Sequence, residues 1–238
     1  MAVAAHNADV AIDPRGESTR ARILDSAEYL FSEQGMNGAS LRTIVAHAGV
    51  NTAAVHYHFG SKQGLLEAVF ARRILPMAEE RLELLADCRA GEDRPPLLHQ
   101  IITAFLEPGM RGRHGGATFA RLRARMAADA SDETRKLMAH YFDSSSAKFL
   151  DALADALPDL PARDLHWRFH YLLATMVYTM ANPGRIQALT DNSCDPSDTD
   201  ASLAYLVPYL AQCFQADPIS EAPVRLDRKT NTHNSSTN

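Results

Sequence analysis

The chain has 238 residues, a formal net charge of −5, 46% hydrophobic residues and 22% charged residues. These values are ordinary for a globular protein, and they exclude a chain that coats nucleic acid through overall positive charge, although a local basic face is compatible with them. Three widely separated cysteines do not form a disulfide framework and indicate a cytoplasmic protein. No apolar run reaches the ~20 residues of a membrane span, and the N-terminus has no signal-peptide pattern.

The first predicted helix follows a short N-terminal segment. Residues 1–17 are small, polar and aperiodic, so they are expected to be disordered. Ser18 or Thr19 can cap a helix that runs to about Gln34, and Gly35 is expected to end it. The apolar stripe of this helix is formed by Ile23, Ala27, Leu30 and Phe31. Such a stripe predicts a core helix that supports the helices after it.

Residues 40–62 have the pattern of a helix-turn-helix. Ser40 is a plausible N-cap, because its hydroxyl can accept a hydrogen bond from an unpaired amide of the first turn. Gly49 can end this helix in a left-handed conformation, and Asn51 can cap a second helix over about 52–59. One face of the first helix is apolar: Leu41, Ile44, Val45 and Ala48. Two short helices joined by a tight turn with glycine predict a DNA-binding element.

The exposed side chains of this stretch are compatible with a polyanion. No aspartate or glutamate occurs in residues 35–62. Arg42 is placed to contact a guanine edge and Lys62 to contact a phosphate, while small residues and Tyr, His and Thr donors suit close contact with the DNA backbone. The predicted DNA-binding residues are Ser40, Arg42, Thr43, Asn51, Thr52, Ala53, Ala54, His56, Tyr57, His58 and Lys62.

These residues carry a resemblance to a known family. The pieces ILDSAEYLFSEQG, S-L-R-T-I-V-x-x-A-G-V and V-H-Y-H-F-G-S-K followed by Leu65 and Leu66 resemble the DNA-binding domain of tetracycline-repressor (TetR) family regulators. The resemblance covers about residues 20–70. Ala53 stands where many relatives have Gly, and His56 where Tyr is common. The resemblance implies a homodimer formed through helices near 165–181 and 202–215, and an effector pocket inside the larger domain.

The rest of the chain predicts helices separated by breakers. Pro76 is expected to break or kink the helix capped by Ser61, and EDRPP at 92–96 forms a second breaker. The glycine- and arginine-rich loop GMRGRHGG is interpreted as a flexible connector rather than a phosphate site. Further helices are predicted at about 97–108, 117–130, 131–156, 164–181 and 202–215. No useful strand periodicity occurs, so the predicted fold class is all-α.

The predicted organisation has four parts. They are a disordered segment (1–17), a helix-turn-helix domain (18–62), a helical ligand-binding and dimerisation domain (63–217) and a disordered tail (218–238). Apolar and aromatic residues of the middle helices are the candidate effector-pocket walls: Phe105, Phe119, Met126, Phe142, Phe149 and Tyr171. Three arginines on one of these helices are interpreted as a solvated face or, alternatively, as a site for an acidic ligand: Arg121, Arg123 and Arg125.

The predicted function is a homodimeric repressor that a small hydrophobic effector releases from its operator. The alternative is a DNA-binding adaptor without a ligand, whose larger domain only dimerises or docks a protein. No catalytic motif is present, so no enzyme and no cofactor are predicted. His166 and His170 have a spacing that could serve a metal, but no further ligand completes a set, and packing is the favoured interpretation.

Overall fold

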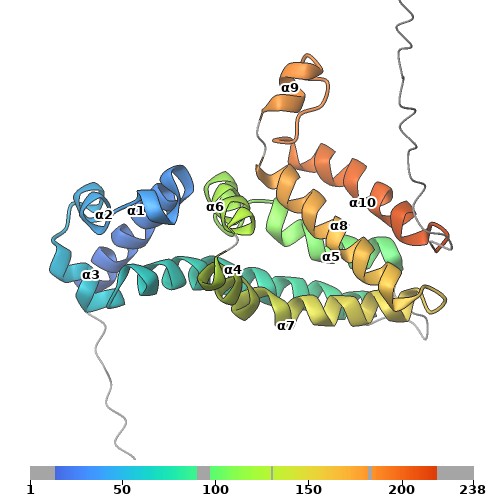
Figure 1. The fold of residues 1–238 in the computed structure, drawn as a ribbon, viewed down its shortest axis with the longest axis horizontal. Helices are drawn as coiled ribbons and strands as arrows, with labels where there is room; N and C mark the ends of the chain where they lie inside the picture. The colour runs from blue at the N-terminus through green and yellow to red at the C-terminus, as the bar shows by residue number, and fades with distance from the viewer. Residues whose placement is uncertain (1–13, 90–96, 130, 182–183, 219–238) are drawn as a thin grey trace, which may run out of the picture.

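The protein is an assembly of helices (Figure 1). The computed structural model describes residues 14–89, 97–129, 131–181 and 184–218, and this part of the chain contains no strand. The helices are α1 (Pro14–Gly38), α2 (Leu41–Ala48), α3 (Thr52–Phe59), α4 (Lys62–Arg89), α5 (Leu98–Met110), α6 (Gly116–Ala128), α7 (Asp132–Ala156), α8 (Ala162–Ala181), α9 (Arg185–Leu189) and α10 (Thr199–Gln215). The predicted all-α fold is confirmed.

Helix α1 starts earlier than the sequence predicted. Its first residue is Pro14, so Ser18 and Thr19 lie inside the helix and do not cap it. Proline suits the first helical position, because the amide that it lacks would have no intrahelical partner there. Gly35 interrupts the regular helix with φ 71° and ψ 171°. The predicted disorder of residues 14–17 is therefore wrong, and residues 1–13 lie outside the described part.

Prolines proved poor markers of helix ends. Pro76 lies inside α4, which continues to Arg89, so of the expected break or kink the break does not occur. Pro108 and Pro208 likewise lie inside α5 and α10. A proline removes one helical hydrogen bond, but packing of α4 against α1, α5 and α7 supports the helix on both sides of it. The breaker at 92–96 and residues 219–238 lie outside the described residues.

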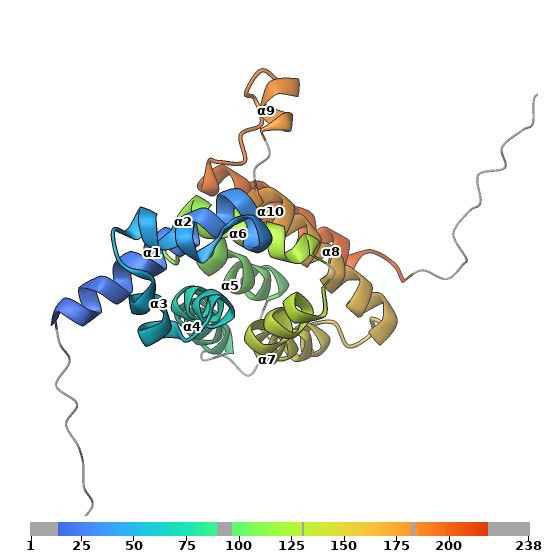
Figure 2. The ribbon, with the colours of Figure 1, turned by 60° about the vertical axis from the view of Figure 1, so that its left-hand side comes forward.

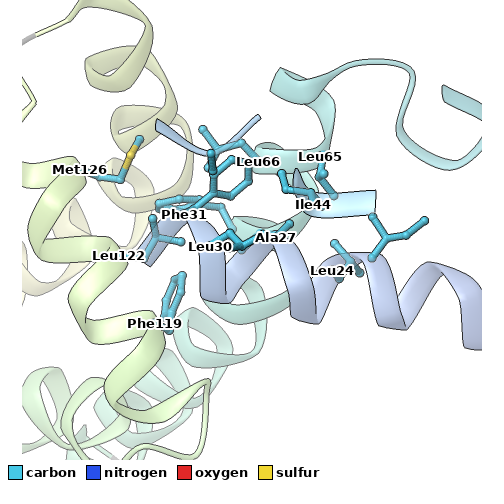
Figure 3. Close-up of a cluster of buried hydrophobic side chains, with 14 of the residues drawn as sticks. Leu24, Ala27, Leu30, Phe31, Ile44, Leu65, Leu66, Phe119, Leu122 and Met126 are labelled. Carbon is cyan, nitrogen blue, oxygen red and sulfur yellow. The ribbon is translucent and has the colours of Figure 1, made fainter. Parts of the chain in front are cut away.

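Two hydrophobic cores lie along α4. The first surrounds α1–α3 and includes Leu65, Phe70 and Met77 of α4 together with residues of α6 (Figure 3). The second lies between α5, α7, α8 and α10 and takes in Leu85 of α4. Helix α6 lies between the α1–α3 end and the α8–α10 end of the molecule (Figures 1 and 2). It packs against α1 on one side and α8 on the other.

The segment that follows α8 differs from its prediction. The expected polar connection contains the short helix α9, which stands out from the bundle (Figure 1). None of the described helices is long and apolar enough to cross a lipid bilayer.

Candidate nucleic-acid interface

The turn between α2 and α3 has the local geometry that the sequence predicted. Ser40 Oγ accepts a hydrogen bond from the Thr43 amide at 3.0 Å, and Asn51 Oδ1 accepts one from the Ala54 amide at 2.9 Å. Gly49 is left-handed, with φ 63° and ψ 40°. Both N-caps and the glycine C-cap are therefore confirmed, and they fix where α2 ends and α3 begins.

Helix α1 stabilises this turn through Arg22. Arg22 Nη2 donates hydrogen bonds to the carbonyl oxygens of Ala48 at 2.5 Å and Gly49 at 3.0 Å. A cation at a helix C-terminus is also favoured by the helix dipole. A Cβ at Gly49 would lie 2.8 Å from Arg22 Nη2, so a larger residue there would displace this contact as well as strain the backbone.

A second close approach joins α3 to α4. Ser61 Oγ accepts a hydrogen bond from the Gly64 amide at 3.0 Å, which confirms Ser61 as the cap of α4. A Cβ at Gly64 would lie 2.2 Å from the Phe59 carbonyl oxygen. Because the obstacle is backbone rather than a flexible side chain, Gly64 sets the separation of the two helices.

The predicted DNA-binding residues lie on one end of the molecule, on α2, α3 and the start of α4. Ala54, His58 and Lys62 are half-buried. The others are exposed: Ser40, Arg42, Thr43, Asn51, Thr52, Ala53, His56 and Tyr57. Tyr57 is 85% exposed, whereas Val55 on the opposite side of α3 is fully buried. Helix α3 therefore presents polar and small side chains to solvent and is held by its buried face.

Hydrogen bonding orients some of these side chains. His56 Nδ1 lies 3.0 Å from the Gly60 carbonyl oxygen. Since a carbonyl oxygen can only accept, Nδ1 carries the proton and Nε2 points elsewhere. The ring of His58 packs edge-on against Tyr57, with 4.9 Å between centroids. These contacts limit the freedom of two side chains on α3 that the sequence assigned to DNA.

The candidate effector residues do not surround one space. Phe119 and Met126 belong to the first core, and Phe105 and Phe149 belong to the second. Phe142 is half-buried against the first core. Tyr171 is 57% exposed on α8, so its assignment to an interior wall is wrong for the single chain. The six residues were chosen by residue type, which does not determine the side of a helix on which they lie.

Arg81 and Arg123 form a buried pair that the sequence did not predict. Arg81 is 1% exposed and Arg123 is 5% exposed. The interpretation of Arg123 as part of a solvated face is therefore wrong. Arg121 and Arg125 do lie nearer the surface, where they contact Glu33 of α1: Arg121 Nη2 lies 3.2 Å from its carboxylate, and Arg125 Nη2 donates to its carbonyl oxygen at 2.9 Å.

A buried ion cluster joins α1 to α4. Glu28 is 3% exposed, and its Oε2 accepts hydrogen bonds from Arg72 Nη2 at 2.5 Å and forms an ion pair with Arg73 Nη2 at 2.9 Å. The only sequence signal for this cluster is the pair of adjacent arginines in α4. Their partner Glu28 lies 44 and 45 positions away, so the pairing could not be predicted from sequence.

The glycine- and arginine-rich loop is held by ion pairs rather than free. Arg111 Nη1 lies 2.7 Å from an Asp200 carboxylate oxygen, and the side chains of Arg113 and His114 each lie 2.6 Å from Glu80. The loop is therefore anchored to α4 and α10, contrary to the expected flexible connector. On α8, His166 and His170 are exposed, and the described residues contain no group of three or more side chains suited to a metal.

Comparison with known proteins agrees with this geometry. A sequence model described as "Bacterial regulatory proteins, tetR family" matches residues 23–69, and one described as "Tetracyclin repressor-like, C-terminal domain" matches residues 99–212. The fold and the two matches define a helix-turn-helix DNA-binding regulator. The chain belongs to the TetR family of transcription regulators, which are not enzymes.

Individual relatives are similar over parts of the chain. The HTH-type transcriptional repressor BepR of Brucella suis is 36% identical over 92 residues, which cover 37% of this chain and 42% of BepR, so this chain spans less than half of that relative. The regulator BetI of Paraburkholderia phymatum is 26% identical, over 58% of this chain and 80% of BetI. Among solved structures, the hemolysin II regulator HlyIIR superposes with a TM-score of 0.58 at 19% identity, over 82% of this chain and 98% of HlyIIR. That likeness is one of fold.

Proposed function

We propose that the chain is a homodimeric repressor that binds its operator through α2, α3 and the start of α4, and that a small-molecule effector releases it. The observation that carries the DNA-binding assignment is the exposed face of α3, where Tyr57 is 85% exposed. The surrounding residues 35–62 contain no acid. A tyrosine hydroxyl with this access can donate to a phosphate.

The test uses an operator selected from random duplexes by the purified chain. Tyr57→Phe removes only the hydroxyl, and Tyr57→Ala removes the ring as well. We expect each variant to weaken operator binding by about 10- to 100-fold, because a hydrogen bond to a charged group contributes about 1.5–3 kcal/mol. Tyr29→Phe is the matched control, since Tyr29 is also exposed (46%) but lies on α1, outside the proposed DNA-binding residues. Unchanged affinity of both Tyr57 variants would remove Tyr57 from the interface.

An aromatic face on α8 and α10 supports the proposed dimer. Trp167, Tyr171 and Tyr178 of α8 are 53–61% exposed, and Tyr205 and Tyr209 of α10 are 82% and 58% exposed. The spacing of the α8 residues puts them on one side of the helix, and α8 and α10 pack against each other. Clustered exposed aromatic residues mark protein interfaces, and two copies of this face would form the expected four-helix contact.

Helix α6 supports a connection between the two functions. Phe119, Leu122 and Met126 point from α6 toward α1 (Figure 3) and are buried in the first core. On its other side α6 packs against α8. We therefore place the coupling path in α6 as well as in α4, since both helices contribute side chains to the first core. A ligand that binds one position of α6 better than another would shift the α1–α3 unit.

A cavity favours the effector-responsive repressor over the adaptor. It has a volume of about 210 Å³ and lies between α5, α6, α8 and the α9–α10 connection, with Gly109, Ala120, Met180 and Thr199 in its walls. An adaptor whose larger domain only dimerises has no need of a cleft at the helix that contacts α1. Thermal shift of the full chain with a library of small molecules identifies ligands, and their effect on operator affinity distinguishes the two functions. Ligands of an effector-responsive repressor must lower its operator affinity, whereas ligands of an adaptor must leave it unchanged.

A further inference from the structure

We propose that Arg81 and Arg123 bind the carboxylate of a small organic acid whose apolar part occupies the adjacent cavity. The proposal rests on the proposed effector response and specifies the chemical class of the effector. Arg81 comes from the middle of α4 and Arg123 from α6. The two guanidiniums lie where α4, α5, α6, α7 and α8 meet.

Neither guanidinium has a carboxylate partner in the described part of the chain. Arg81 contacts the face of Phe105, with 4.2 Å from Cζ to the ring centroid, and its Nη2 lies 3.5 Å from Met176 Sδ. Arg123 contacts the sulfur atoms of Met77 at 3.9 Å and Met180 at 3.7 Å. Thioether sulfur is a weak acceptor, and the Nε atoms of both arginines are buried without any partner.

The two charged groups also lie close to each other. A Cβ built on Gly109 of α5 would be 3.2 Å from Arg81 Nη2 and 3.4 Å from Arg123 Nη1. Burial and then the neighbouring charge of Arg123 lower the pKa of Arg81 to about 9, and burial lowers the pKa of Arg123 to about 10. Both arginines remain positively charged at neutral pH. Two buried like charges side by side lack a counter-charge, which an anion would supply.

The cavity borders this pair. Gly109, which lies against both guanidiniums, forms part of its wall, as does Met180, whose sulfur contacts Arg123. Neither arginine lines the cavity itself, so the carboxylate would reach the pair past Gly109 and Met180. Ala120, which lies one turn before Arg123 on α6, also forms part of the cavity wall. The volume of about 210 Å³ is below the range of about 300–1,000 Å³ that holds drug-sized ligands. A small acid with an alkyl or aryl body fits both the charge and the size.

The position of Arg123 explains how such a ligand would act on DNA binding. Arg123 directly follows Leu122, which packs in the first core beneath α1. An anion that draws the two guanidiniums together therefore pulls on the helix that contacts α1. Paired, charge-assisted hydrogen bonds from guanidinium to carboxylate are the strongest contacts available to such a ligand. A neutral molecule of the same shape would lack them.

The test is calorimetric titration of the full chain at neutral pH with octanoate and benzoate, and with 1-octanol and benzyl alcohol as neutral counterparts. We expect at least one acid to bind about 10- to 100-fold more tightly than its alcohol. Arg81→Met and Arg123→Met should each lose a similar factor. Arg81→Lys keeps the charge without the planar fork and should show a smaller loss. Arg121→Met, whose arginine is 42% exposed and paired with Glu33, is the control and should bind normally.

Equal binding of acid and alcohol would overturn the proposal, as would acid binding that neither Arg81→Met nor Arg123→Met weakens. Failure of both acids to bind at up to about 5 mM would also overturn it, because that concentration detects even millimolar affinity. Circular dichroism identifies variants that fail to fold. If the Met variants do not fold, acid binding by Arg81→Lys tests the proposal instead. The proposed repressor function fails separately: an acid that binds the arginine pair but leaves operator affinity unchanged would keep the site and refute the effector role.

Discussion

Replacing Arg81 by Met should stabilise the ligand-free protein. Arg81 is 1% exposed, and burial, together with the neighbouring charge of Arg123, lowers its pKa to about 9, well below the usual range of an arginine. One pKa unit corresponds to about 1.4 kcal/mol, so keeping this group charged at neutral pH costs the fold roughly 5 kcal/mol. The cation–π contact with Phe105, at 4.2 Å from the ring centroid, offsets about 2 kcal/mol of that cost. Met has a flexible apolar chain that can fill the space of the arginine stem.

The net expectation for Arg81→Met is a gain of about 1–4 kcal/mol, the range found when buried charges are replaced by apolar residues. Urea unfolding at neutral pH, followed by circular dichroism, measures it. Arg121→Met is the control and should change the free energy of unfolding by no more than about 1 kcal/mol, because its ion pair with Glu33 is exposed to solvent.

The pH dependence gives a second check with a definite sign. The folded-state pKa of Arg81 is about 9, well below its value in the unfolded chain. The unfolded chain therefore binds more protons between these values, and stability of the wild type rises with pH across the window. The advantage of Arg81→Met is full below pH 9 and should shrink above it. A variant that is destabilised at neutral pH, or an advantage that grows above pH 9, would refute the argument that Arg81 is an uncompensated buried charge.

The other predictions concern the joints of the fold and the proposed dimer. Gly64→Ala should destabilise the protein by about 1–3 kcal/mol in urea unfolding, because its Cβ would lie 2.2 Å from a backbone oxygen; the exposed neighbour variant Gln63→Ala should be neutral, and an equal effect of the two would exclude the steric cause. Phe119→Leu should leave octanoate binding intact in calorimetry but reduce its effect on operator affinity, since Phe119 packs between α6 and α1; an unchanged effect would remove α6 from the coupling path. Tyr178→Arg and Tyr205→Arg should each give monomers in sedimentation, because they bury an unpaired charge in the proposed interface while leaving the exposed side of a single chain intact; dimers of both variants would place the interface elsewhere.

The helix-turn-helix could be predicted from sequence because its signals are local. Ser40, Gly49 and Asn51 act within a few residues of their own positions, and each one occupies the cap that the sequence assigned to it. The apolar stripe of α2 follows the same short-range logic. The structure adds the hydrogen bonds from Arg22 that hold the turn, which join residues 26 and 27 positions apart.

The larger domain was harder to predict, because its details depend on packing. Pro76 breaks an isolated helix, but α4 is supported by neighbours on both sides of it. Arg123 lies on a helix with two more arginines, and only its packing against α4, α7 and α8 decides that it alone of the three is buried. Residue type likewise selected Tyr171 as a pocket wall, although its side of α8 faces solvent.

We propose that α2 and α3 recognise a specific DNA sequence, while the start of α4 holds the DNA backbone. A salt titration of Arg42→Ala and Lys62→Ala on operator and scrambled duplexes tests it directly, with the exposed Lys136 of α7 mutated to Ala as the control. Arg42→Ala should cost about 1–3 kcal/mol on the operator only. Lys62→Ala should weaken both duplexes and lower the salt slope by about two in a dimer. Equal losses on both duplexes for Arg42→Ala would limit Arg42 to a backbone contact, and no loss for either variant would contradict the claim.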